Sequence, residues 1–565
     1  MRVARIALGL LIALALLLPQ FTFDVGQVRA GGEKIDPALR KEMVSDPGRR
    51  LPVIIQMSQP KGPPPDRAGR RLAEDAIALL KSLGPDGRQI GGLPLIGGAA
   101  GFANARAIDS LSRNPRVAFI YQDSVIKPQA VSYATRSVPQ LPAPYPFTVR
   151  ASKVWQEGTT GKGVAVAVLD SGITPHIDLI QPTNRLLAAV NFAGDLGGMP
   201  DAGGHGTHVA GLIAGNSTGA DVSGLQTQFS TSGDASQADY VGVAPGANLI
   251  DVRVLNSQGS GRISSVIAGI RWVIANQSRY GIRIINLSLG APINASYRND
   301  PLSAAVEIAW KRGIVVVASA GNHGPDSGSV GTPGIDPYVI TVGAIDDQGT
   351  AVSQDDVLAA FSSWGTPLDS TSKSDVVAPG HRIVSLRSPG SYLDLQLPDR
   401  VVVGRTGPNY FRLTGTSMST AIVSGAVALM LERQPGLRPD HVKAILSGTT
   451  QPYGQYGSKS LSNPAAHGSG LINASAAVSS PILGVANQGL RPADAFARAL
   501  YPLLYGQVLT WQDPNYAGVD WDNLAWDNLA WDNLAWDNLA WDNLAWDNLA
   551  WDNLAWDSFG WDNLD

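Results

Sequence analysis

Strongly apolar segments alternate with helical patterns between Lys162 and Val342, and this alternation limits the fold more than any other feature of the chain. Five runs are apolar enough to be covered on both faces: Val164–Leu169, Asn248–Leu255, Ile282–Leu287, Ile314–Ala320 and Val339–Val342. Helical patterns lie between them at His208–Ala214, Ser264–Asn276 and Pro301–Arg312. This order predicts an α/β fold, a parallel sheet with helices on both faces. In such sheets, sites form beyond the carboxyl ends of the strands.

A serine opens the most apolar stretch of the chain. The segment Leu413–Met430, LTGTSMSTAIVSGAVALM, leaves almost no polar face, which indicates a helix buried on all sides. Ser417 lies in its first turn, where unpaired N–H groups and the helix dipole would stabilise an oxyanion. Serine is also a favoured helix cap, so this segment alone leaves both interpretations open.

Three further polar residues occur where a strand ends or a helix begins. Asp170 ends the strand VAVAVL, His205 lies in GHGTHVAG, and Asn322 follows GIVVVASAG. With Ser417 they supply the carboxylate, general base, oxyanion donor and nucleophile of an acyl-transfer site. Taken singly, Asp170 suits a turn, Asn322 suits a left-handed backbone, and the two histidines of His-Gly-Thr-His suit a metal pair. No third ligand from Cys, His or Glu lies nearby in sequence, however, and four such residues together favour catalysis.

These motifs resemble the active-site signatures of subtilisin-like serine proteases (subtilases, peptidase S8 family). The signatures are Asp170-Ser171-Gly172, His205-Gly206-Thr207-His208-Val209-Ala210-Gly211 and Gly415-Thr416-Ser417-Met418, in the chain order of that family. The resemblance runs from residue 151 to 480. It implies a subtilisin-like fold and a serine endopeptidase that works through an acyl-enzyme. It makes Asp170, His205 and Ser417 the catalytic triad, Asn322 the side-chain oxyanion donor and His208 structural.

The resemblance also implies where a substrate binds. Ser288-Leu289-Gly290 would pair with an extended substrate and form one wall of the S1 pocket, and Gly259-Ser260-Gly261 would be the facing strand. Ala318-Ser319-Ala320 and Val330-Gly331 would complete the pocket. Because these residues are small and uncharged, we expect broad specificity on protein or peptide substrates. A dedicated processing protease with narrow specificity is the alternative.

The amino terminus carries the pattern of a secretory signal. Arg2 and Arg5 precede the apolar run Ile6–Leu18, and Val28-Arg29-Ala30 has the small residues of a cleavage site. The run is short for a bilayer span, although an uncleaved membrane anchor is the alternative. We therefore assign residues 1–30 to a signal peptide and expect a secreted protein, extracellular or associated with the cell surface.

A small α+β unit is expected at residues 51–127, after a leader at 31–50. It resembles the inhibitor-type propeptide of the family, so we expect a zymogen whose propeptide is an intramolecular inhibitor and is removed by self-processing. Residues 138–146 contain four prolines, which favours a linker over 128–150 with the maturation site between Lys127 and Pro146. The catalytic domain is expected at 151–480, followed by a second linker at 481–520.

Residues 521–565 form a low-complexity tail in which Trp-Asp-Asn-Leu-Ala repeats with a period of five. This period keeps no single face on a helix or a strand, which favours disorder. The tail carries ten Asp and no Lys or Arg, so a formal charge of −4 for the chain leaves +6 for the other residues. The alternative is an arm that binds cell-surface material or a processing factor.

Composition excludes several chemistries. The chain has no cysteine, which excludes disulfides, cysteine nucleophiles and cysteine-ligated metals. No basic run indicates nucleic acid. Acyl transfer requires no cofactor. The resemblance allows a structural calcium ion, but residues 216–240 replace the loop that holds calcium in many relatives. We therefore assign no calcium ligand, and the metal site stays unknown.

We expect a monomer. The rival hypothesis is an inactive subtilase-like scaffold that acts through its Trp/Asp-rich tail.

Two departures from the family pattern bear on the site. After Ser417-Met418, Ser419 to Ile422 replace the usual Ala-Thr-Pro-His, which removes a proline kink but no catalytic group. We therefore expect activity to be retained. Residues 386–412 form an insertion before Ser417, which we expect at the rim of the cleft.

Overall fold

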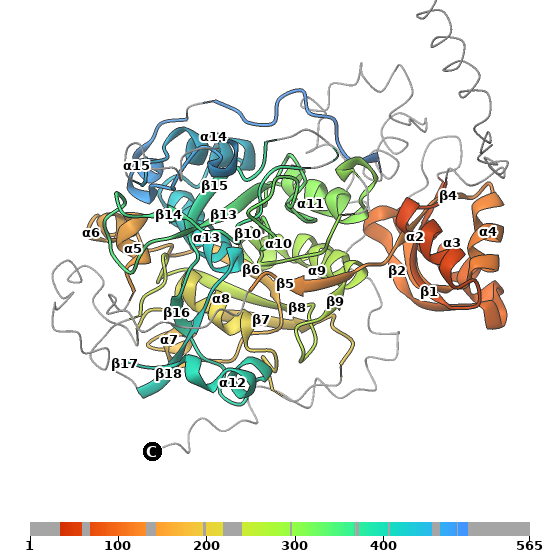
Figure 1. Cartoon of the computed structure of the whole chain (residues 1–565), viewed down its shortest axis with the longest axis horizontal. Helices are drawn as coiled ribbons and strands as arrows, with labels where there is room; N and C mark the ends of the chain where they lie inside the picture. The colour runs from red at the N-terminus through yellow and green to blue at the C-terminus, as the bar shows by residue number, and fades with distance from the viewer. Residues whose placement is uncertain are drawn as a thin grey trace, which may run out of the picture.

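The structure is a computed structural model in which two units can be followed (Figure 1). It describes residues 34–58, 68–130, 143–195, 199–217, 240–293, 296–366, 368, 372–404, 407–454, 464–482 and 484–494. The expected signal peptide, the pentad tail and residues 495–520 lie outside these ranges. Within them, no helix combines the length and the apolar character needed to cross a bilayer.

The larger unit is built on one largely parallel sheet, which confirms the predicted α/β class. The strand order is β14-β13-β12-β10-β6-β8-β7, with β15 paired to β13, and only β14 runs antiparallel. The strands are β6 (Ala165–Asp170), β7 (Leu186–Asn191), β8 (Asn248–Arg253), β10 (Ile282–Leu287), β12 (Val315–Ser319), β13 (Ile340–Asp346), β14 (Val357–Leu358) and β15 (Val376–Pro379). The sequence missed β7, an edge strand whose residues are only half-buried or exposed.

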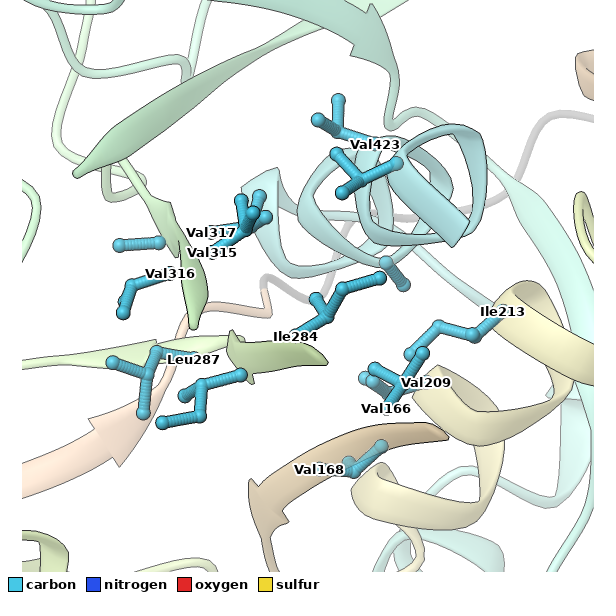
Figure 2. Close-up of a cluster of buried hydrophobic side chains, with 14 of the residues drawn as sticks. Val166, Val168, Val209, Ile213, Ile284, Leu287, Val315, Val316, Val317 and Val423 are labelled. Atoms are coloured by element: carbon cyan, nitrogen blue, oxygen red, sulfur yellow. The ribbon is translucent and has the colours of Figure 1, made fainter. Parts of the chain in front are cut away.

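Helices cover both faces of this sheet. Figure 2 shows Val209 of α8 (His205–Ala214) close to Val166 of β6, with Val423 of α13 (Thr416–Arg433) over the same side of the sheet. Leu169, which points to the opposite face of β6, instead lies against Gly269 of α9 (Ile263–Ala275). Helix α11 (Pro301–Lys311) packs beside α9.

Helix α13 is the buried helix that the sequence predicts. All residues from Thr416 to Leu431 are buried, and the helix continues to Arg433 without a break. The Ser419 hydroxyl donates to the carbonyls of Ala378 and Pro379, at 2.9 and 3.1 Å. The residues that replace the proline of the family pattern are therefore accommodated in a continuous helix.

The amino-terminal unit is an antiparallel sheet, order β2-β3-β1-β4, with the α-helices α2, α3 and α4 packed against it. Its elements are α2 (Pro37–Ser45), β1 (Leu51–Met57), α3 (Ala68–Ser82), β2 (Gly87–Leu93), β3 (Gly98–Ala103), α4 (Ala105–Arg113) and β4 (Val117–Gln122). Strand β3 ends at Ala103, because the Asn104 side chain caps α4 by accepting from the Ala107 N–H. Ile35 and Leu39 belong to this core, so the unit starts before residue 51.

The larger unit extends beyond both predicted boundaries. Helix α5 (Tyr145–Thr148) lies inside the expected linker, yet Tyr145 is buried and its hydroxyl donates to the Val241 carbonyl at 2.8 Å. At the other end, Tyr338 donates to the Leu490 carbonyl at 2.7 Å, and Ala493 is fully buried. Proline-rich composition did not mark a linker here, because Pro144 and Pro146 begin and stiffen a short packed helix.

The insertion before Ser417 forms a separate small sheet. Strands β16 (Ile383–Leu386), β18 (Gly407–Leu413) and β17 (Val401–Gly404) pair antiparallel in that order. Along the chain, helix α12 (Tyr392–Gln396) lies between β16 and β17. This sheet packs against α8, whose Gly211 lies against Ser385 and Leu386.

Candidate active site

Asp170 and His205 meet at the carboxyl end of β6. The His205 Nδ1 lies 2.8 and 2.9 Å from the two carboxylate oxygens of Asp170, and both side chains are buried. The Ser171 N–H donates to the same carboxylate at 2.7 Å. The contact between His205 and the Asp170 carboxylate places the imidazole proton on Nδ1 and leaves Nε2 as an acceptor. The His205 Nε2 is buried and has no hydrogen-bond partner in the described part of the chain, as a general base requires.

Asp201 connects the segments that carry these two residues. Its carboxylate accepts from the Ser171 hydroxyl and the Gly204 N–H, both at 2.7 Å, and from the N–H and hydroxyl of Thr207, at 2.8 and 2.6 Å. The Ser171 oxygen in turn accepts from the Gly206 N–H at 3.0 Å. Asp201 is not among the site residues predicted from the sequence. The sequence signal that could have identified Asp201 is its place four residues before His205 in a glycine-rich loop.

The insertion holds the same loop from outside. The N–H groups of Tyr392 and Leu393 donate to the carbonyls of Ala202 and Gly203, at 2.7 and 3.2 Å, and the Ser388 hydroxyl donates to the Asp201 carbonyl at 2.9 Å. The insertion therefore lies directly beside the loop that leads into His205.

Asp201→Asn should lower the turnover rate on the order of 100-fold. Four donors face the Asp201 carboxylate, so an amide NH₂ group would oppose some of them and shift the loop by part of an ångström, and displacements near 1 Å cost rates of this size. Steady-state kinetics on a peptide substrate measures the effect. Asp326→Asn, at an exposed position, is the matched control. Equal rates in both variants would contradict a positioning role for Asp201.

His208, the second histidine of its motif, lies away from the chemistry. Its Nε2 is 3.2 and 3.1 Å from the carbonyls of Ile383 and Phe411, so it ties α8 to β16 and β18. His205 and His208 thus have separate partners, which argues against a metal pair. The described residues also contain no group of three or more His, Asp or Glu side chains placed to bind a metal. Residues 218–239, most of the loop expected to replace a calcium loop, lie outside them.

Acidification should destabilise the fold through His208. Burial, with His205 nearby, lowers the pKa of His208 to about 3, whereas an unfolded histidine titrates near 6.5. Between these values the unfolded chain binds the extra proton, so stability falls as the pH falls. The expected loss from pH 7 to pH 4.5 is about 2.5 kcal/mol. Urea unfolding of Ser417→Ala protein with and without His208→Gln measures it, and an equal pH dependence would contradict the prediction.

Ser417 opens α13 but is not its cap. The N-cap position is held by Gly415, which has no side chain to cap the helix, and the Ser417 hydroxyl donates to the Ser288 carbonyl at 2.8 Å. Among the described residues, no hydrogen bond joins Ser417 to His205. The helix-cap interpretation of Ser417 is therefore wrong, and its hydroxyl lies on the wall expected to bind substrate.

Asn322 follows β12 and presents a free donor beside Ser417. Its Oδ1 accepts from the N–H and the hydroxyl of Thr416, at 3.0 and 3.1 Å. The Nδ2 of the same amide therefore points away from Thr416. The Nδ2 is buried without a partner in the described structure. A buried donor without an acceptor is costly, so this arrangement suits a group that binds an oxyanion.

A strand from the amino-terminal unit occupies the expected substrate cleft. Strand β5 (Val125–Pro128) lies between β11 (Leu289–Gly290) and β9 (Gly261–Arg262), antiparallel to both. Figure 1 shows β5 reaching from the amino-terminal unit to the side of β9. Pro128 and Lys127 pair with Leu289 and Gly290, and the next N–H, of Gln129, donates to the Ser288 carbonyl at 3.2 Å.

The facing wall differs slightly from the expectation. Ile126 pairs with Gly261 and Val125 with Arg262, while Gly259 lies against Pro128. Ser260 instead closes its own turn, because its N–H and carbonyl bond to Asn256. Gly331 lies behind the wall, where its N–H donates to the Ala320 carbonyl at 3.2 Å and the adjacent Thr332 pairs with Ala291.

The carbonyl of Gln129 lies at the expected oxyanion site. It accepts from the Ser417 N–H at 3.3 Å. A Cβ added to Gly415 would lie 2.1 Å from this oxygen and 3.1 Å from the Asn322 Nδ2. The Gln129 side chain is 8% exposed, and its Nε2 lies 3.3 Å from the Gly290 carbonyl. The sequence contains no local signal for Gln129, whose role depends on where the strand before it lies.

Comparison with known proteins agrees with this geometry. The model of the subtilase family, peptidase S8, matches residues 161–470, more than half of the chain. The chain belongs to the subtilase family. It is therefore a serine-type endopeptidase, and the resemblance inferred from the motifs is confirmed.

Individual subtilases are similar over most of their length. Serine protease AprX of Bacillus subtilis (strain 168) is 41% identical over 350 residues, which are 60% of this chain and 72% of that protein. Subtilisin E of Bacillus subtilis (strain 168) is 34% identical over 389 residues, 68% of this chain and 81% of that protein. The crystal structure of fervidolysin from Fervidobacterium pennivorans, a keratinolytic enzyme related to subtilisin, has a TM-score of 0.53 at 21% identity. It covers 78% of this chain and 62% of that one, and it supports the fold.

Proposed function

We propose that this subtilase hydrolyses peptide bonds with Ser417, His205, Asp170 and Asn322. The Ser417 Oγ attacks the substrate carbonyl while the His205 Nε2 takes its proton, and Asp170 holds the imidazole and stabilises its charged form. The Ser417 N–H and the Asn322 Nδ2 bind the oxyanion. His205 then protonates the leaving amine and activates the water that cleaves the acyl-enzyme. The supporting observation is a peptide carbonyl, that of Gln129, at the Ser417 N–H.

The first bond cut is Gln129–Ala130 in the same chain. Strand β5 delivers this peptide in the extended, main-chain-paired form in which proteases bind substrates. The bond lies within the window from Lys127 to Pro146 that the sequence indicates. Self-processing at this position would separate the amino-terminal unit from the catalytic unit.

The amino-terminal unit then stays bound as an inhibitor of the cleft. The Asp123 carboxylate accepts from the N–H and the hydroxyl of Ser264, at 3.0 and 2.8 Å, and so caps helix α9, which has no side-chain cap of its own. Arg262 donates to the Asp123 carbonyl at 3.0 Å. Ile126 is fully buried in the core of the catalytic unit. These contacts do not depend on the bond after Gln129 and would survive its cleavage.

Broad specificity on protein and peptide substrates follows from the way the cleft holds strand β5 and Gln129. The backbone of β5 pairs with β11 on one side and with β9 on the other. The Gln129 side chain donates to the Gly290 carbonyl rather than to a charged group. Main-chain pairing is indifferent to the substrate's side chains. Mapping the cleavage sites on an unfolded protein tests this, and a single narrow sequence motif would favour the dedicated processing protease.

The remaining proposals rest on sequence. The signal pattern at 1–30 supports secretion to the exterior or to the cell surface, and the Trp- and Asp-rich tail supports an arm that binds cell-surface material. The comparisons offer no support for an inactive scaffold.

Labelling of the purified protein with a serine-directed fluorophosphonate tests the catalytic assignment. We expect one label, on the peptide that contains Ser417, and none after Ser417→Ala. A protein that takes no label after its amino-terminal unit has been removed would contradict the assignment and revive the scaffold hypothesis.

A further inference from the structure

Two aspartates face each other at the loop end of the β13–β14 hairpin, far in sequence from the triad. Strands β13 and β14 pair antiparallel, with Ile345 opposite Leu358 and Asp346 opposite Val357. The next step of this register places Asp347 opposite Asp356. Directly opposed residues of an antiparallel pair have Cβ atoms about 5 Å apart, and like charges there repel.

Neither carboxylate is neutralised by the described protein. Asp347 is 3% exposed and Asp356 is 0% exposed. Three of their four oxygens, Asp347 Oδ2 and both oxygens of Asp356, have no hydrogen-bond partner, and no Lys, Arg or His of the described residues forms an ion pair with either. The remaining oxygen, Asp347 Oδ1, accepts from the Gly349 N–H at 3.1 Å.

The neighbouring polar groups are already engaged. Asp346 pairs with His381 at 2.7 Å, and the Asp355 carboxylate accepts from the Thr350 hydroxyl at 3.0 and 3.1 Å. The Tyr453 hydroxyl is bonded to the Nδ1 of His467. The described neighbours therefore leave the two buried carboxylates without a positively charged partner.

We propose that Asp347 and Asp356 bind a Ca²⁺ ion. Carboxylate oxygens are the ligands that this hard cation prefers, and a buried pair of them offers the charge it needs. Ca²⁺ takes six to eight oxygens, so loop carbonyls and water complete the shell. Mg²⁺ requires a stricter octahedron at shorter distances, and a hairpin loop of eight residues suits the larger, more tolerant ion.

The ion would fasten the loop 348–355 to helix α5 and to the segment that follows helix α14. The Thr350 carbonyl accepts from the Thr148 hydroxyl of α5 at 3.2 Å, and the Ser353 carbonyl accepts from the Gly454 N–H at 2.9 Å. The first of these segments follows the cleavage site, and the second comes after helix α14 (Pro439–Gly448). The expected role is therefore stability of the enzyme rather than catalysis.

The test compares thermal unfolding of full-length Ser417→Ala protein in millimolar CaCl₂ and in EDTA at pH 9, since the inactive protein cannot digest itself. We expect Ca²⁺ to raise the Tm on the order of 5 °C, MgCl₂ to have little effect, and the rise to shrink at pH 6 because protons compete for the carboxylates. Asp356→Asn and Asp347→Asn should each abolish the rise. In EDTA, Asp356→Asn should melt above its parent, because the repulsion between the two carboxylates is gone.

Asp326→Asn, which removes one exposed carboxylate elsewhere, is the control and should keep the full rise. Equilibrium dialysis with Ca²⁺ should show one ion fewer per chain in Asp356→Asn, and Asp347→Asn repeats the comparison if the first variant does not fold. An unchanged rise and an unchanged ion count in both variants would overturn the proposal. So would a parent protein whose Tm does not respond to Ca²⁺, which would point to a proton shared by the two carboxylates.

Discussion

Ser417→Ala should abolish hydrolysis of peptide substrates, with a loss of kcat on the order of a million-fold, the size known for the equivalent change in a subtilisin. The physical reason is that the substitution removes the nucleophile itself. The Ser417 N–H contacts the carbonyl of a bound peptide, and the helix that carries it is buried from Thr416 to Leu431. Steady-state kinetics on a peptide substrate measures the loss.

The same variant tests self-processing in the intact mass of the protein. The wild type should release a fragment that ends at Gln129, whereas Ser417→Ala should keep residue 129 joined to residue 130. Ser419→Ala, on the same buried helix, is the matched control and should still be processed. If Ser417→Ala were cut at the same bond, another protease would be responsible. If the wild type kept the bond, self-processing would be excluded while the hydrolytic assignment would still stand on the kinetics.

Asn322→Ala should lower kcat on the order of a hundred- to a thousand-fold and change KM little, as loss of an oxyanion donor does in a related enzyme. The Asn322 Nδ2 has no partner among the described residues, so its hydrogen bond is available for the transition state and the substitution removes it there. The Oδ1 contacts with Thr416 would also be lost. Fluorophosphonate labelling of Ser417 should persist but become slower.

A structural effect of Asn322→Ala can be separated from a catalytic one. Thermal unfolding reports the loss of the Thr416 contacts, and the kcat of folded protein reports the loss of the donor. An unchanged kcat in a folded variant would remove Asn322 from the mechanism, whatever its effect on the Tm.

The central sheet and the candidate triad could be predicted from sequence because their signals are local. A strand covered on both faces must be apolar throughout, as β6 and β12 are, and a helix buried on all sides must lack a polar face, as α13 does. Polar residues at the ends of such elements stand out, which is how Asp170, His205, Asn322 and Ser417 were found. The subtilase family followed from the order of their motifs.

Strands with weak patterns were missed for the converse reason. Strand β2 contains three glycines among seven residues, and β7 lies at the edge of its sheet, where one face needs no apolar cover. Domain boundaries failed in a similar way, because the proline-rich segment around Tyr145 looks like a linker until its burial is known.

The sequence by itself therefore determined the fold class, the family and the candidate catalytic residues, since each depends on a pattern within a few consecutive positions. Tertiary structure alone decided which peptide lies at the oxyanion site, which carboxylate ties the loop of His205 to that of Asp170, and which two aspartates face each other in the β13–β14 hairpin. Gln129 and Ser417 are far apart in the chain, as are Asp201 and Ser171. Such pairs are set by how strands pair and helices pack, and no local pattern records that.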